Sequence, residues 1–174
     1  AQQVAWILLP ANSDNNDKLP SQPVLQEINS YCRFIAESPD RSSVADRLTQ
    51  IPSSLIPCSA IATVWFEENQ QEGRIIGHRG FAHDLSETKV LFGKGLVGSC
   101  AKNRSPLLMQ VHEGRKTVLF SEQEKPEDLQ CIATLPIQLN DTLYGVLMVG
   151  SSDPYAVTHA DLDKLALIVS AAAS

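Results

Sequence analysis

Four cysteines are the residues of this sequence best suited to chemistry, as nucleophiles, redox groups or metal ligands: Cys32, Cys58, Cys100 and Cys131. They lie far apart and form none of the close pairs that zinc and dithiol motifs use. A nucleophilic thiol needs a pKa lowered by a helix N-terminus or a cation, and Cys100 is predicted to lie in an early helical turn. Thiol chemistry at Cys100 is one interpretation, and a small core thiol is the alternative. An iron–sulfur site is a further alternative, because its ligands need not be adjacent in sequence.

The histidines offer a second type of metal ligand. None of the four stands four residues from another on a predicted helix, so the spacing indicates no mononuclear metal site. Haem held by one histidine is an alternative, with His112 as the ligand because it lies where a predicted strand meets a long loop. A solvent-exposed histidine is the competing interpretation.

A glycine motif of the form GxGxxG occupies residues 93–98, GKGLVG. Such spacing can cradle a dinucleotide pyrophosphate at a helix N-terminus. That use requires a following parallel strand with an acidic residue about twenty positions on, whereas a long polar loop and an antiparallel hairpin follow here. We therefore interpret the glycines as a tight turn. The sequence also groups no serine, histidine and acid into a nucleophilic triad.

Apolar side chains with a few polar anchors are typical of small-molecule sites. Aromatic residues at several predicted strand ends could line such a site, with plain core packing as the alternative. The sequence does not identify a cofactor. The residues predicted to line a ligand or cofactor site are Trp65, Phe81, Phe92, Cys100, Met109, His112, Phe120 and Cys131.

Composition restricts the class of protein and its partners. The 174 residues fit one domain at 21–174, with residues 1–20 as an N-terminal extension or linker. The net charge is −6 and the 14 basic residues are scattered, so we expect no nucleic-acid partner. The apolar run at residues 4–9 is far shorter than the roughly 20 residues that span a bilayer. We expect a cytoplasmic chain with no membrane partner.

Periodicity predicts the helices that must position these residues. Apolar residues at three- and four-residue steps predict a helix from a cap at Ser21, and a second helix begins near Ser42 or Ser43 with Asp46 in a capping-box-like position. A short helix follows the glycine turn and ends at Asn103. A closing helix opens at the capping motif Thr158–Asp161.

Strand patterns complete the predicted fold. Residues 59–66 are apolar almost throughout, as in a strand covered on both faces, and residues 74–81, 89–92 and 107–111 are further candidates. Residues 131–139 and 142–151 predict a hairpin whose turn at Asn140 needs positive φ. The expected fold is α+β, with about five to six antiparallel strands, helices on one face and a pocket roofed by loops and a short helix on the other.

Three segments in this order resemble the GAF domain family over about residues 40–174. VADRLTQIPSSLIPCSAIATVWFEE is similar to the family's second helix and first strand, and GKGLVGSCAKNRSPLLM to its glycine turn, short helix and next strand. CIATLPIQLNDTLYGVLMVGSSDPYAVTHADLDKLALIVSAAA is similar to its last two strands and closing helix. The Cys-His pair of bilin-binding members and the signature of cyclic-nucleotide members are missing.

The resemblance implies a non-catalytic sensor domain, and hence no enzyme. It implies a small-molecule ligand, a homodimer through the terminal helices, and an output domain such as the histidine kinase of a two-component system. Three alternatives stay open. They are a redox sensor using cysteine thiols, haem or an iron–sulfur cluster, a ligand-free dimerisation scaffold, and a thiol-dependent enzyme like the free methionine sulfoxide reductases.

Overall fold

The computed structural model of the chain describes residues 21–67, 71–111, 117–121, 124 and 127–174. The predicted extension at residues 1–20 lies outside this range. Helices occupy four segments: α1 (Gln22–Ala36), α2 (Arg41–Thr49), α3 (Gly95–Asn103) and α4 (His159–Ala173). Strands occupy six: β1 (Ala60–Phe66), β2 (Glu72–Arg79), β3 (Lys89–Leu91), β4 (Leu107–Gln110), β5 (Cys131–Leu139) and β6 (Thr142–Ser151).

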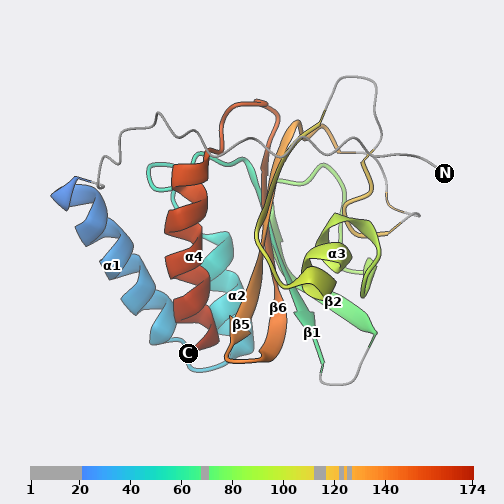
Figure 1. The fold of residues 1–174 in the computed structure, drawn as a ribbon, viewed down its shortest axis with the longest axis horizontal. Helices are drawn as coiled ribbons and strands as arrows, with labels where there is room; N and C mark the ends of the chain where they lie inside the picture. The colour runs from blue at the N-terminus through green and yellow to red at the C-terminus, as the bar shows by residue number, and fades with distance from the viewer. Residues whose placement is uncertain (1–20, 68–70, 112–116, 122–123, 125–126) are drawn as a thin grey trace.

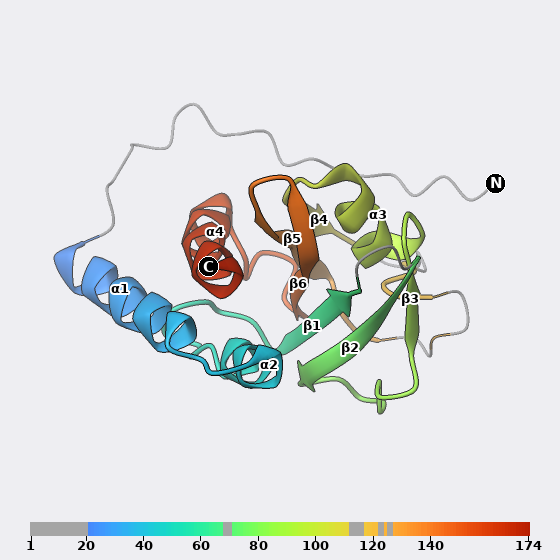
Figure 2. The ribbon, with the colours of Figure 1, turned by 90° about the horizontal axis from the view of Figure 1, so that it is seen from below.

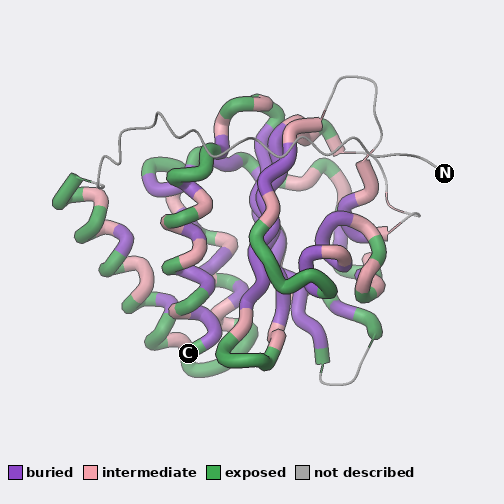
Figure 3. The backbone as a smooth tube through the Cα atoms, viewed as in Figure 1, coloured by how far each residue is buried: buried purple, intermediate pink, exposed green. Residues whose placement is uncertain are grey.

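The strands form one antiparallel sheet in the order β3-β2-β1-β6-β5-β4. The helices α1, α2 and α4 lie on one side of this sheet, and α3 lies on the other (Figures 1 and 2). This arrangement confirms the predicted α+β class and its helix-covered face. The central strands β1, β5 and β6 are buried along most of their length because both of their faces are covered (Figure 3).

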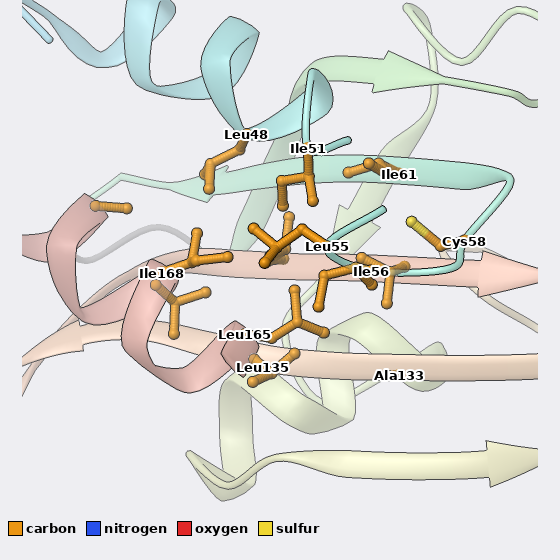
Figure 4. Packing of buried hydrophobic residues seen from close by; sticks show 14 of the residues in the cluster. Leu48, Ile51, Leu55, Ile56, Cys58, Ile61, Ala133, Leu135, Leu165 and Ile168 are labelled. Atoms are coloured by element: carbon orange, nitrogen blue, oxygen red, sulfur yellow. The ribbon is translucent and has the colours of Figure 1, made fainter. Parts of the chain in front are cut away.

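The sheet separates two hydrophobic cores. The helix-side core lies between the sheet and α1, α2 and α4, and the loop that joins α2 to β1 fills its centre (Figure 4). Its large members include Leu48, Ile51, Leu55, Ile61 and Ile168. The α3-side core lies on the opposite face and includes Val64, Leu96, Phe120 and Met148. Since successive side chains of a strand point to opposite faces, each central strand contributes to both cores.

Helix starts follow the predictions in part. Thr158 and Asp161 form the predicted capping box of α4, with the Thr158 amide 2.9 Å from the Asp161 carboxylate. Ser21 holds the N-cap position of α1, but its side chain makes no capping hydrogen bond. The prediction for α2 was wrong in detail: Asp40 is its cap and accepts from the Ser43 amide at 2.8 Å. Aspartate and serine are similarly good caps, so residue type alone did not show which of the neighbouring polar residues would begin the helix.

The β5–β6 hairpin has the predicted ends and the predicted turn. Asn140 adopts φ 55°, in the left-handed region that a tight hairpin turn requires. Gly145, in β6, passes very close to β1, where an added Cβ would stand 2.2 Å from the Val64 carbonyl oxygen. The hairpin therefore fixes how β5 and β6 meet the middle of the sheet.

Candidate functional site

The glycine motif shapes the turn that places α3 against the sheet. Gly93 and Gly95 have positive φ, 79° and 66°, and the Gly93 amide donates to the Gly98 carbonyl at 2.8 Å. A Cβ on Gly98 would lie 2.0 Å from the Leu91 carbonyl oxygen, so only glycine allows α3 to approach β3 this closely. The motif thus serves packing, as interpreted from the sequence.

The first-turn amides of α3 are already used within the chain. The Leu96 amide donates to the Val118 carbonyl at 2.9 Å, and the Val97 amide donates to the Leu119 carbonyl at 3.0 Å. A phosphate at this helix N-terminus would need those same donors. The arrangement therefore supports the interpretation of the glycines as a turn and disfavours a pyrophosphate site.

Two glutamates accept hydrogen bonds from backbone amides in or near the loop before β5. The Glu124 carboxylate accepts from the amides of Leu119 and Phe120, and the Glu127 carboxylate accepts from the amides of Ala82 and His83 at 3.0 and 3.3 Å. Glu127 thereby links this loop to the loop that joins β2 to β3. The described parts of the two loops form the cover of the α3-side core together with α3.

Aromatic rings form a chain beneath this cover. The Phe120 ring is buried, and its centroid lies 6.0 Å from that of Phe81 in an edge-on arrangement. The Phe81 ring in turn lies 6.4 Å from the His78 ring. The Phe92 ring meets Phe66 of the same core edge-on at 6.1 Å, yet 40% of the residue stays exposed. These rings give the cover an apolar inner side.

Cys100 projects from α3 into the same core. Its Sγ donates a hydrogen bond to the Ser105 carbonyl at 3.5 Å. Burial raises the pKa of the Cys100 thiol to about 11, while the neighbouring Thr134 hydroxyl acts weakly in the opposite direction. Among the described residues, Thr134 Oγ1 has no hydrogen-bond partner of regular geometry, although it is fully buried. A raised pKa is the reverse of what an activated nucleophilic thiol requires.

The structure brings together some of the residues predicted to line a site and separates others. Cys100, Met109 and Phe120 belong to the α3-side core, with Phe81 packed against it. Trp65 lies elsewhere, because the Arg41 guanidinium of α2 stands 5.1 Å above its ring and Tyr144 lies beside it. Cys131 belongs to the helix-side core. His112 lies outside the described residues.

The iron–sulfur site that was kept as an alternative does not assemble from the four cysteines in this fold. The sheet lies between Cys100 and the remaining three cysteines, Cys32, Cys58 and Cys131, which belong to or pack against the helix-side core. All four thiols are free. Over the described ranges, no three His, Cys, Asp or Glu side chains are close enough to hold a metal ion. Burial also raises the pKa of Cys58 to about 11 and raises those of Cys32 and Cys131.

Sequence reasoning missed Glu124, Glu127 and Thr134. The two glutamates lie in a charged, aperiodic segment, where carboxylates ordinarily face solvent. Their partners are backbone amides, which every residue except proline has, so the sequence does not show which amides they would contact. Thr134 lies in a strand that is buried on both faces. The alternation of apolar and polar residues therefore could not show that its hydroxyl lies beside the Cys100 thiol.

Solved structures with a similar fold include GAF domains. The GAF domain of an Acinetobacter phosphoenolpyruvate-protein phosphotransferase matches with a TM-score of 0.74 at 14% identity, covering 88% of this chain and 92% of that one. The corresponding domain from Coxiella burnetii matches with a TM-score of 0.74 at 13% identity, covering 86% and 90%. The chain has the fold of a GAF domain. The resemblance inferred from sequence is thereby confirmed at the level of the fold. No protein-family model and no curated protein sequence matches this GAF-fold chain.

Enzymes also share this GAF fold. Free methionine-R-sulfoxide reductase from Neisseria meningitidis, solved with its substrate, matches with a TM-score of 0.70 at 12% identity, covering 86% of each chain. Two further free methionine-R-sulfoxide reductase structures also match. The prediction that the chain is not an enzyme was therefore wrong, because the fold from which it was inferred also occurs in these enzymes.

The helices also bear on whether the chain could insert into a membrane. Within the described ranges, each helix is too short or too polar to cross a bilayer.

Proposed function

We propose that this GAF-fold chain is a sensor domain of a signalling protein that binds a small molecule on the α3 side of its sheet. The observation that carries the proposal is the division of the interior into two cores by one sheet. The α3-side core is covered by a short helix and loops, joined through backbone hydrogen bonds and through amides that donate to the Glu124 and Glu127 carboxylates. Covers of this kind can open locally at small cost, as ligand-binding loops must.

Signal output would pass through the other face. The helices α1 and α4 lie side by side (Figure 2), and each presents a large exposed apolar residue, Leu25 and Leu167, with exposed fractions of 37% and 52%. In the proposal these residues meet a second copy of the chain, and an output domain such as a histidine kinase is attached. A cytoplasmic location is part of the same proposal.

A thermal-shift screen of the purified chain against small metabolites tests ligand binding. A ligand raises the melting temperature by an amount set by its concentration relative to Kd. To locate the site, Phe81→Ala should weaken binding of any hit at least tenfold, because Phe81 packs under the α3-side cover. Phe34→Ala, on α1, is the matched control and should leave Kd unchanged.

Native mass spectrometry tests the dimer. Leu167→Glu should convert a dimer to monomers, since a charge in an apolar interface is costly. Leu139→Glu, at the β5–β6 hairpin, changes another exposed leucine, 44% exposed, and should leave the dimer intact. A monomer in all three samples would remove the dimer from the proposal.

An enzymatic function is the alternative to the sensor, and its activity can be measured directly. Thiol-dependent reduction of free methionine-R-sulfoxide by the wild type, lost in Cys100→Ser, would replace the sensor with an enzyme. A flat metabolite screen together with a dimer would replace it with a ligand-free scaffold.

A further inference from the structure

The Glu124 carboxylate is held by a row of backbone amides. Its Oε1 accepts from the Leu119 amide at 2.5 Å, and its Oε2 accepts from the Phe120 amide at 2.8 Å. The Ser121 amide lies 3.4 Å from the same Oε2. Two neighbouring amides thus take one carboxylate oxygen each, and a carboxylate is the group whose two oxygens fit such a pair.

The same two peptide groups connect this carboxylate to α3. The carbonyls of Val118 and Leu119 accept from the Leu96 and Val97 amides in the first turn of α3. The peptide group between Val118 and Leu119 therefore accepts from the helix at its oxygen and donates to Glu124 at its nitrogen. The peptide group between Leu119 and Phe120 repeats this arrangement. Hydrogen bonds in series polarise one another, so the positive end of the α3 dipole strengthens both donors toward an anion.

The position of this amide pair suits a ligand with an apolar part. Phe120 donates its amide to the carboxylate, while its ring is buried in the α3-side core against Phe81. The backbone of one residue therefore marks the boundary between a carboxylate site and an apolar interior. A small molecule with a carboxylate at one end and an apolar group at the other matches both sides.

We propose that the Leu119 and Phe120 amides are the carboxylate-recognition site for the ligand, and that Glu124 occupies this site in the free protein. The inference rests on the proposed ligand-binding function and adds the chemical class of the ligand. A ligand carboxylate replaces that of Glu124 at the Leu119 and Phe120 amides. The contacts between α3 and residues 118 and 119 stay in place.

Competition with a tethered group predicts a gain in affinity when Glu124 is removed. A side chain five residues from its partner acts at an effective concentration of about 1 mM or more. The Glu124→Ala variant should therefore bind a carboxylate probe at least tenfold more tightly than the wild type.

The experiment uses ¹⁵N-labelled chain and two probes that differ only in charge, 3-phenylpropionate and 3-phenylpropionamide. In Glu124→Ala, the acid should shift the Leu119 and Phe120 amide resonances and raise the melting temperature, and the amide should do neither. In the wild type, the same resonances should shift only at tenfold higher acid concentration or more. Glu127→Ala, which loses the contacts to Ala82 and His83 but keeps Glu124, should behave as the wild type.

Two outcomes overturn the carboxylate site. One is the absence of acid-specific shifts at Leu119 and Phe120 in both Glu124→Ala and the wild type. The other is equal affinity in the two. Should Glu124→Ala not fold, Glu124→Gln takes its place, because it keeps one acceptor oxygen and loses the charge. The outcomes stay separable from the sensor proposal: probe binding with no stabilising metabolite refutes the sensor alone, whereas a metabolite that binds equally as acid and as amide refutes the carboxylate site alone.

Discussion

The ammonium group of Lys164, on α4, lies 3.2 Å from the backbone carbonyl oxygen of Leu55, in the loop that joins α2 to β1. The same Nζ lies 3.4 Å from the Asp161 carboxylate, and the Lys164 side chain is only 22% exposed. At the other end of this loop, the Arg79 guanidinium of β2 donates to the Ile51 carbonyl at 3.2 Å. Two cations thus hold the loop between α4 and the sheet.

Replacing Lys164 by methionine should destabilise the fold. Lys164→Met keeps most of the apolar stem and leaves the Leu55 carbonyl without its charged donor, at a cost of about 1 to 2 kcal/mol. Urea denaturation with an unchanged m-value measures this loss. Lys89→Met is the control, because the Lys89–Glu72 pair is exposed and should contribute less than about 0.5 kcal/mol. Equal effects of the two changes would contradict the role assigned to Lys164.

Stability should fall at alkaline pH because of the buried thiols. The folded chain raises the Cys100 pKa from 9.0 to about 11, so the unfolded chain loses this proton first as pH rises. The contribution of Cys100 to the free energy of unfolding is fully present below pH 9 and is lost as the pH rises through about 11. The loss should reach roughly 1 kcal/mol at pH 10. Urea denaturation in reductant from pH 8 to 10 should show a smaller decline for Cys100→Ala than for the wild type. Cys32→Ala, at a half-buried thiol, should decline nearly as the wild type does.

An alanine at Gly98 should disrupt the seating of α3. The added Cβ meets the Leu91 carbonyl oxygen, which belongs to the backbone and cannot rotate away. We expect a loss of about 2 kcal/mol or more in the free energy of unfolding. Ser99→Ala places the same alanine at the next residue of the helix without adding a Cβ, and should stay within about 0.5 kcal/mol of the wild type. A Gly98→Ala variant as stable as Ser99→Ala would show that α3 can shift freely.

The capping box should contribute measurably to α4. Thr158→Ala removes the side chain that accepts from the Asp161 amide and should cost about 1 kcal/mol. Thr158→Ser keeps the hydroxyl and should recover most of that loss. Thermal unfolding compares the three proteins, and identical melting temperatures for the alanine and serine variants would rule out a capping contribution.

Local patterns were sufficient to predict most elements of this fold. The hairpin of β5 and β6 was predicted to the residue, because apolar runs ended at a turn where Asn140 takes positive φ. The start of α4 followed from its capping box. Both signals are contained in a few adjacent residues, so no tertiary information is needed to read them.

The candidate site could not be predicted as fully. Trp65 and Cys131 were grouped with Cys100 and Phe120, although they lie across the sheet from them. A strand covered on both faces is apolar at every position, so its sequence does not say which face a given residue joins. The Glu124 and Glu127 contacts were also out of reach, because they depend on where distant backbone amides are brought by the fold.

The shared sheet has a consequence for how such a chain can change over time. Adjacent residues of β1 pack in different cores. Ile61 belongs to the helix-side core, whereas Ala62 belongs to the α3-side core. Substitutions at alternate positions can therefore remodel one interior while the other keeps its geometry. The residues beneath α3 could therefore diverge among related chains while the packing of α1, α2 and α4 against the sheet is kept.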